Sequence, residues 1–366
     1  HCTSSAASDV YKRQYMTHAN PEFSIIIVTY NSNDYLAECI RALITQGNKN
    51  FEVIIVDNNS HEDLINFDNF NSLDLKVIKL EKNFGFAAAN NIGAKKATGE
   101  WLITLNPDAI PEDNWLSEIE VGIKRYPKTK IFGSKQLKFD DPSKLDGAGD
   151  HYHFSGIAWR GGEGDPAESI LEDAIVMSPC AAAAIYYRDI YVLLGGMAED
   201  FFCYYEDVDL GLRFRLAGHK TVQLAGAKVR HVGSTTAGKN SKFIKYYVSR
   251  NRVWTFIRCV PGLLFVTCLP FLILSILTRL CLSIFAGDTF TKLRAFYDAL
   301  RGLFRIWNDR KLIQKARKSS VTQFSSDMTW SIGKLILRAT DSRPVPCENC
   351  AKEEPASFQA GGIDDS

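Results

Sequence analysis

The sequence predicts an α/β protein with a doubly wound, mostly parallel β-sheet, followed by an apolar and basic helical segment. Three observations lead to this prediction. Strand-like and helix-like segments alternate over residues 23–105, polar residues stand directly after the strand-like segments, and residues 259–278 carry no charge. A chain of 366 residues is long enough for one large or two modest domains with a full core.

The alternating part begins with residues 23–30, a continuous apolar and β-branched run typical of a strand buried on both faces. The segments that follow it in order are a helix over 34–45, strands over 51–56 and 75–80, a small-residue helix over 85–97 and a strand over 101–105. This β-α-β-α-β order predicts a parallel sheet, because parallel strands need crossover connections between them.

Polar residues stand at or directly after the carboxyl ends of the predicted strands. They are Thr29, Tyr30 and Asn31, then Asp57, and then Asn106 and Asp108. In doubly wound sheets ligands bind at the carboxyl ends of the strands, so we expect these side chains to converge on one binding site.

Beyond residue 130 the pattern is looser, and glycines punctuate a loop region of the kind that often forms an active-site lid. His151 and His153 lie there. The sequence favours an exposed pair in a short strand, with a metal pair as the alternative. Residues 176–187 then predict a strand of small residues.

An acidic segment comes next, with Glu206, Asp207 and Asp209 preceded by two tyrosines and followed after about twenty residues by His231. Like charges so close together raise the pKa of at least one of the carboxylic acids, which suits a site that takes up a proton or holds a cation. The alternative is a helix start whose acidic side chains interact favourably with the helix dipole.

The net charge of +1 conceals an asymmetry, because residues 241–340 contain 17 Lys or Arg against 4 Asp or Glu. Within them, the uncharged run 259–278 is long enough to span a membrane, although Pro261, Gly262 and Pro270 argue for a broken or interfacial segment. A buried core hairpin is the remaining alternative. Basic residues around an apolar run favour an anionic membrane surface over nucleic acid as a partner.

The sequence therefore divides into four parts. Residues 1–20 are expected to be an extraneous or disordered leader, 21–240 the α/β domain, 241–340 a helical membrane-associating region and 341–366 a disordered tail. The nine cysteines are scattered, which favours a reducing, cytoplasmic compartment. The pair Cys347 and Cys350 in the tail has no assigned role.

Five motifs in order make the chain resemble glycosyltransferase family 2, and within it the bacterial rhamnosyltransferase-like branch. The motifs are Val28-Thr29-Tyr30-Asn31, Val56-Asp57-Asn58-Asn59-Ser60, Asn83-Phe84-Gly85 with the small residues after it, Leu105-Asn106-Pro107-Asp108, and Glu206-Asp207-Val208-Asp209 with His231. The resemblance covers roughly residues 22–260.

The resemblance implies a GT-A fold and transfer of a sugar, with inversion, from a nucleoside diphosphate to an acceptor hydroxyl. It implies a divalent cation, Mg²⁺ or Mn²⁺, because the leaving diphosphate develops negative charge. Asp108 matches the metal-holding position of the DxD motif, whose first Asp is Asn106 here, and His231 matches a histidine that joins the metal or the diphosphate.

The same resemblance assigns the remaining site residues. Asp57 matches the carboxylate that binds the donor base, and Thr29, Tyr30 and Asn31 line the same nucleotide pocket. Asn83 and Gly85 belong to a donor-binding segment, with tight helix–sheet packing as the alternative for Gly85. Asp207 matches the general base, Glu206 orients the loop or the acceptor, and Asp209 serves structure.

The expected reaction is transfer of rhamnose from dTDP-rhamnose to a polyprenyl-linked glycan at the cytoplasmic face of the bacterial inner membrane, in surface polysaccharide synthesis. A UDP-sugar donor (hexose, N-acetylhexosamine or galactofuranose) is the alternative within the same fold. A non-catalytic membrane scaffold that binds sugar nucleotides is the alternative from another class. A nucleotidyltransferase lacks support, since the sequence shows no glycine-rich phosphate loop with basic residues.

Overall fold

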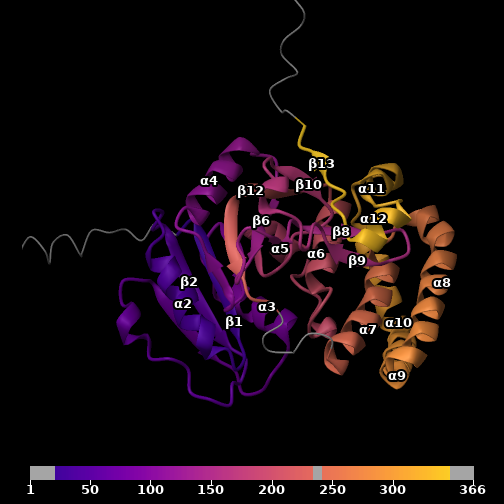
Figure 1. Ribbon diagram of the computed structural model, residues 1–366, viewed down its shortest axis with the longest axis horizontal. Helices are drawn as coiled ribbons and strands as arrows, with labels where there is room; N and C mark the ends of the chain where they lie inside the picture. The colour runs from indigo at the N-terminus through magenta and orange to yellow at the C-terminus, as the bar shows by residue number, and fades with distance from the viewer. Residues whose placement is uncertain (1–20, 234–240, 347–366) are drawn as a thin grey trace, which may run out of the picture.

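The computed structural model describes residues 21–233 and 241–346 (Figure 1). The predicted leader, Cys347, Cys350 and most of the predicted tail lie outside the described residues. Within the described part, an 11-stranded mixed sheet forms the centre of the molecule, with helices on both faces and a helical bundle at one side.

The main path of the sheet runs in the order β13-β10-β12-β6-β11-β4-β1-β2-β3, with β5 paired to β12 and β7 paired to β6. A second, two-stranded sheet consists of β8 and β9. The strands are β1 Phe23–Thr29, β2 Phe51–Asp57, β3 Leu75–Lys79, β4 Trp101–Leu105, β5 Ala109–Pro111, β6 Ile131–Lys138, β7 Leu145–Gly147, β8 Asp150–Tyr152, β9 Ala158–Arg160, β10 Ala174–Val176, β11 Ala183–Tyr187, β12 Thr221–His231 and β13 Arg343–Pro344.

The first four strands confirm the predicted parallel sheet. All seven residues of β1 and of β2 are buried, as continuous apolar runs require. The two strands pair in parallel from Phe23 opposite Phe51 to Thr29 opposite Asp57, so their carboxyl ends lie at one edge. The next strand along, β11, breaks the pattern because it runs antiparallel to both β4 and β6.

The single strand predicted over residues 176–187 is wrong. The structure has two strands, β10 and β11, which lie apart in the sheet. The chain turns between them, where Pro179 has no N–H for a sheet ladder and the Ala183 N–H donates to the Cys180 carbonyl at 3.2 Å.

Helices cover both faces of the sheet because alternate strand residues point to opposite sides. Ile25 and Ile27 of β1 pack with α2 and α4, whereas Ile26 and Val28 pack with α3, α5 and α6. The bounds are α2 Asn33–Ile44, α3 Phe86–Lys96, α4 Trp115–Arg125, α5 Arg188–Leu193 and α6 Glu206–Leu216.

The C-terminal helices form a bundle against α6 rather than a separate body (Figure 1). Val208 and Leu212 of α6 share one apolar cluster with Trp254, Phe256 and residues of the later helices. These helices are α7 Lys242–Cys259, α8 Gly262–Ala286, α9 Thr289–Arg301, α10 Leu303–Lys315, α11 Val321–Asp327 and α12 Ile332–Leu337.

The predicted tail starts too early at residue 341. The Asp341 carboxylate pairs with Lys334 and Arg343, and β13 at residues 343–344 joins the sheet through β10. The predicted exposure of His151 and His153 is also wrong, since both are buried. The Asp341 N–H donates to His151 at 3.1 Å, while His153 contacts the Ser155 hydroxyl at 2.8 Å, so the two histidines have different hydrogen-bond partners.

Candidate active site

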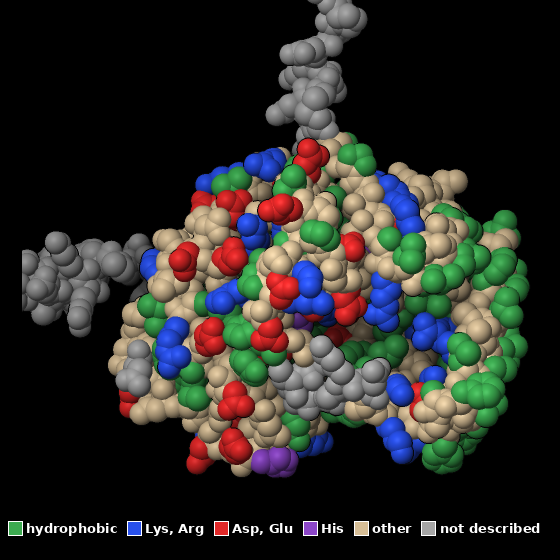
Figure 2. All heavy atoms as spheres, viewed as in Figure 1, with side chains coloured by type: hydrophobic (Ala, Val, Ile, Leu, Met, Phe, Trp, Pro, Cys, Tyr) green, Lys and Arg blue, Asp and Glu red, His purple; other side chains and the backbone are tan. Residues whose placement is uncertain are grey.

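A cavity of about 320 Å³ opens at the carboxyl ends of β1, β2 and β4, and the predicted site residues meet there. Figure 2 shows a hollow in this face of the molecule, with charged side chains around its rim. The predicted residues that line the cavity are Tyr30, Asn83, Gly85, Asn106, Asp108, Glu206, Asp207 and His231. Thr29, Asn31 and Asp57 lie at the same sheet edge but do not line it.

Strand pairing brings Asp108 and His231 together although they are far apart in the sequence. The antiparallel pair of β5 and β12 sets His231 opposite Ala109, and the Val232 N–H donates to the Asp108 carbonyl at 3.1 Å. The His231 Nε2 then lies 3.6 Å from the Asp108 Oδ1.

A second carboxylate, Asp146, orients the histidine from its other side. The His231 Nδ1 lies 2.8 Å from the Asp146 Oδ2, and the Arg160 guanidinium pairs with the same carboxylate. Burial alone would lower the pKa of His231, but hydrogen bonds with Asp108 and Asp146 outweigh it and raise that pKa. With Nδ1 engaged, Nε2 is the nitrogen that faces Asp108.

The cavity contains donors of the kind that a divalent cation prefers. The Asp108 carboxylate and His231 Nε2 face each other, and the buried Asn106 Oδ1 has no hydrogen-bond partner among the described residues. No group of three His, Cys, Asp or Glu suited to a metal occurs in residues 21–233 and 241–346. A cation here would therefore need ligands from solvent or substrate, as Mg²⁺ sites often do.

The acidic segment forms the start of α6, where Glu206 and Asp207 line the same cavity. The half-buried Asp207 accepts hydrogen bonds from the Ala181 N–H at 3.0 Å and from the Val208 N–H at 2.8 Å. Burial raises the pKa of Asp207, while these N–H groups and the charge of Arg160 oppose the rise. Asp207 is thus a fixed carboxylate with an increased proton affinity, as a general base requires.

Two further buried carboxylic acids surround Asp207. Burial raises the pKa of Glu206 well above its usual value, and the nearby charge of Asp207 adds to this effect. Burial and the same charge raise the pKa of Asp150 to about 7. Three carboxylic acids in one buried cluster oppose each other's ionisation, so Glu206 and Asp150 both bind a proton more tightly beside a charged Asp207.

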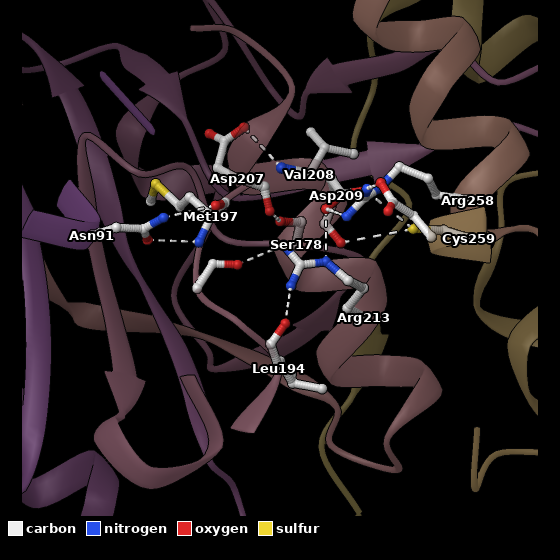
Figure 3. A network of polar contacts seen from close by, with 12 residues as sticks. Asn91, Ser178, Leu194, Met197, Asp207, Val208, Asp209, Arg213, Arg258 and Cys259 are labelled. Atoms are coloured by element: carbon white, nitrogen blue, oxygen red, sulfur yellow. Dashed lines mark hydrogen bonds and ion pairs between the residues drawn. The ribbon is translucent and has the colours of Figure 1, made fainter. Parts of the chain in front are cut away.

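Asp209 serves structure, as expected. Its buried carboxylate lies between Arg213 of the same helix and Arg258 of α7, with nitrogen–oxygen distances of 2.7 Å to each (Figure 3). Figure 3 also shows that Asp207, two residues earlier, points away from this ion-pair network.

The loop before α6 has an unusual backbone, because Phe202, Tyr204 and Tyr205 all have positive φ angles of 66–71°. The buried Asn251 of α7 holds it in place. Its Nδ2 donates to the carbonyls of Phe201, Cys203 and Tyr204 at 2.8–2.9 Å. Such strain persists where surrounding contacts fix the backbone, and it is common at functional sites.

The segment before α3 is shaped by this loop. Gly85 has φ 88°, and a Cβ there would lie 2.5 Å from the Phe202 carbonyl oxygen, so only glycine fits. Asn58 and Asn83 bond each other at 2.9 Å and also accept the N–H groups of Phe84 and Gly85. Gly85 therefore lies close to the loop before α6, and it also lines the cavity.

Several residues of the site did not follow from the sequence, and these are Asp146, Asp150, Arg160, Cys180 and Phe243. Arg160 contacts the Cys180 sulfur at 3.3 Å and pairs with Asp146. Most of these residues lie in the loose region after residue 130. Its many glycines were the one sequence signal that pointed there.

Residues 24–191 match the family model described as Glycosyl transferase family 2. The O-antigen biosynthesis protein RfbC of Myxococcus xanthus is 30% identical over 232 residues, a match that covers 60% of this chain and 18% of that protein. An uncharacterized glycosyltransferase of Haemophilus influenzae is 24% identical over 117 residues, which cover 31% of this chain and 36% of that protein. The chain thus spans about a third or less of the length of these relatives.

Two solved structures share the fold. S. aureus TarS 1-349 in complex with UDP-GlcNAc aligns with TM-score 0.54 and 18% identity, covering 87% of this chain and 93% of that chain. GalNAc-T7 with UDP, GalNAc and Mn²⁺ aligns with TM-score 0.52 and 17% identity, covering 66% of this chain and 50% of that chain.

Proposed function

We propose that this chain transfers a sugar from a nucleoside diphosphate to a hydroxyl of a glycan acceptor. The premise is that the chain contains a glycosyl transferase family 2 domain. The observation that carries the proposal is the single cavity lined by both Asp207 and the facing pair Asp108 and His231. A sugar transferase needs a base for the acceptor and a binding site for the diphosphate in one space.

The proposed reaction inverts the anomeric carbon. The acceptor oxygen attacks that carbon as its proton passes to the Asp207 carboxylate, while the bond from the anomeric carbon to the diphosphate oxygen breaks. The nucleoside diphosphate leaves with the bonding electron pair. Asp207 is suited to this step because backbone N–H groups fix its orientation and burial raises its pKa.

Asp108, His231 and Asn106 are proposed to bind the diphosphate end of the donor through Mg²⁺ or Mn²⁺. Such a cation would neutralise the charge that develops on the leaving diphosphate. Asp146 fixes the ring of His231 so that Nε2 faces the site, which is the usual role of a carboxylate behind a metal-binding histidine.

The best-supported donor is dTDP-rhamnose and the best-supported acceptor a polyprenyl-linked glycan of a bacterial surface polysaccharide. The motif resemblance supports the donor, and the name of the M. xanthus relative, an O-antigen biosynthesis protein, supports the pathway class. The alternative donor is a UDP-sugar, which the complex of TarS 1-349 with UDP-GlcNAc favours.

We place the enzyme at the cytoplasmic face of the bacterial inner membrane. Among the described residues, α8 at Gly262–Ala286 is a helix long and apolar enough to cross a membrane. A lipid-linked acceptor and a membrane-associating helix would bring enzyme and substrate to the same surface.

The test measures how fast the purified protein releases nucleoside diphosphate from a panel of dTDP- and UDP-sugars. Each donor is tested in Mn²⁺ and in EDTA, and in the presence and absence of a polyprenyl-linked acceptor. We expect release from one donor, loss of release in EDTA and faster release with the acceptor. An exposed carboxylate on α5 gives a matched control, Asp189→Asn, which should behave as the wild type. Failure to bind any sugar nucleotide would overturn the enzyme proposal and favour the scaffold.

A further inference from the structure

α8 turns an unusually large apolar face to the outside. Only 17% of its most apolar window is buried, and Leu263 near its start and Phe285 near its end are 72% and 91% exposed. The exposed apolar side chains of this helix, here called the α8 face, are Leu263, Val266, Phe271, Ile273, Leu274, Leu277, Leu282, Ile284 and Phe285. A soluble protein rarely leaves so many large apolar side chains in contact with water.

The opposite side of α8 is fixed to the body of the protein along the whole helix. Leu264, Cys268, Leu272 and Ser283 are buried, and they extend from the first turn to the last. These positions pack on α7, α9 and α11. The helix therefore does not stand free of the domain at either end.

The middle of α8 contacts the catalytic domain directly. The Ser275 hydroxyl lies 3.4 Å from the Ser155 carbonyl and accepts a hydrogen bond from Arg252 at 2.6 Å. Phe271 packs edge-on against Phe154, with ring centroids 4.9 Å apart. Residues 154–156 follow β8, which carries Asp150 of the acidic cluster.

These contacts argue against a spanning helix. With about 1.5 Å per residue, the 25 residues of α8 could cross a hydrocarbon core of about 30 Å. Its centre would then lie at the bilayer midplane and carry Arg252 and the loop 154–156 with it. Non-helical backbone and a guanidinium at that depth are strongly unfavourable.

The exposed charges of residues 241–340, which include α8, are of one sign. Residues 241–340 all lie in the described part of the chain. Every exposed charged side chain there is Lys or Arg, because Asp288 is buried and Asp298, Asp309 and Asp327 are partly buried. Figure 2 shows apolar side chains along the edge where α8 lies, with basic side chains between this edge and the hollow. An apolar surface bordered by basic side chains is complementary to an anionic lipid surface.

We propose that α8 lies in the plane of an anionic bilayer surface, with the α8 face among the acyl chains and the basic residues at the headgroups. The proposal rests on the membrane partner of the proposed function and specifies how that partner is bound. The protein is then monotopic, so the whole catalytic domain stays on one side of the membrane. The cavity remains in water beside the surface that would hold a lipid-linked acceptor.

Depth measurements on vesicles test the orientation. Spin labels are placed at Leu263→Cys, Leu274→Cys and Phe285→Cys in the 366-residue chain, with vesicles of phosphatidylcholine and phosphatidylglycerol. The cysteines that are not buried in the structure or that lie outside the described residues, Cys2, Cys203, Cys281, Cys347 and Cys350, are replaced by Ser. We expect the three labels to lie at one shallow depth. A deep label at 274 with the labels at 263 and 285 near opposite surfaces would overturn the proposal, because that pattern identifies a spanning helix.

A binding measurement tests the surface itself. The double variant Leu274→Glu, Phe285→Glu should lose at least about tenfold in binding to these vesicles, since two large apolar side chains no longer enter the lipid. The matched control is Leu193→Glu on α5, an exposed apolar residue at 74% exposure outside the α8 face, which should bind as the wild type. Wild-type protein should bind vesicles of phosphatidylcholine alone more weakly. Equal binding by the double variant and the wild type would overturn the proposal.

These assays contain no sugar nucleotide, so the two proposals fail separately. Vesicle binding without any donor hydrolysis would contradict the proposed function and leave the α8 orientation intact. Donor hydrolysis without vesicle binding would contradict the α8 orientation and the membrane placement, and it would leave the proposed sugar transfer intact.

Discussion

Asp207 and Arg160 show how individual residues set the chemistry of the cavity. Burial raises the pKa of Asp207, and the positive charge of Arg160 opposes that rise. As the proposed base, Asp207 must be ionised to accept a proton, so activity should fall as the pH falls through the raised pKa of Asp207. The charge of residue 160 is expected to influence the pH at which this loss begins.

Replacing Arg160 with Gln removes the positive charge and should raise the pKa of Asp207 further. The acid limb of the profile of kcat/KM against pH should then move to higher pH by about one unit. Arg160→Lys keeps the charge and is the matched control, with its acid limb close to that of the wild type. If both variants lose activity equally and neither shifts the limb, Arg160 serves structure and does not tune the base.

The site residues that the sequence could predict stand next to regular elements. Asn106 and Asp108 follow a buried strand, and Glu206 and Asp207 begin a helix, so their positions follow from strand and helix patterns. Asp146 and Arg160 lie at short strands in a loop region without periodicity, and they meet His231 only through tertiary contacts. Nothing in the local sequence around residue 146 indicates a partner 85 positions away.

At the scale of elements, α7 holds the loop before α6 in its strained form. The Asn251 amide group donates to three carbonyls between residues 201 and 204, and Arg250 donates to the carbonyls of Asp200 and Phe201. Because Glu206 and Asp207 come directly after this loop, we expect the contacts made by α7 to determine where the Asp207 carboxylate points.

Asn251→Leu tests this role. The change keeps a side chain of similar size but removes the donors to three buried carbonyls. We expect a loss of roughly 2–4 kcal/mol in the free energy of unfolding and a lower kcat in the protein that remains folded. Denaturant titration and steady-state kinetics measure both effects. Asn308→Ala on the exposed side of α10 is the control, with a change within about 0.5 kcal/mol. Wild-type stability and kcat in Asn251→Leu would contradict a role for Asn251 in holding the loop.

Regular elements of the fold were predictable to different degrees. The strands β1, β2 and β4 follow from apolar runs that only a doubly covered sheet can bury. The antiparallel insertion of β11 between β4 and β6 did not follow from any pattern, since strand order depends on long-range pairing. The uncharged run 259–278 predicts an apolar segment, but the break that Pro270 suggests is absent, because α8 continues through this proline as one helix. The buried stripe that fixes α8 to the domain appears only in three dimensions.

At the scale of the whole molecule, the α/β domain and the C-terminal helices share one core. The change in composition predicts a boundary at residue 240, but Phe201, Val208 and Leu212 pack in the same cluster as residues of α7, α8 and α11. The buried Asp209 is also paired with Arg258 across this boundary. Composition reveals a change in surroundings and does not reveal which side chains pack together.

A chain shortened to residues 21–240 should therefore fail to fold as a soluble monomer. The truncation exposes the apolar side of α6 and leaves Asp209 without Arg258, and breaking a buried ion pair in this way costs about 3–5 kcal/mol. Size-exclusion chromatography and thermal unfolding check this expectation against a control chain of residues 21–346. A monomeric 21–240 chain with the melting temperature of the control would show that the two regions are independent domains.

The central claim is that donor binding and proton removal take place in one cavity but depend on different residues. The most direct measurement compares the wild type, Asp207→Asn and the control Asp189→Asn, using the donor that the panel identifies. Calorimetry gives the affinity for the donor, and steady-state kinetics give the rate of nucleoside diphosphate release. The account predicts that Asp207→Asn binds the donor as the wild type does and releases at least about 100-fold less nucleoside diphosphate in the presence of acceptor. Turnover by Asp207→Asn at the wild-type rate would contradict it.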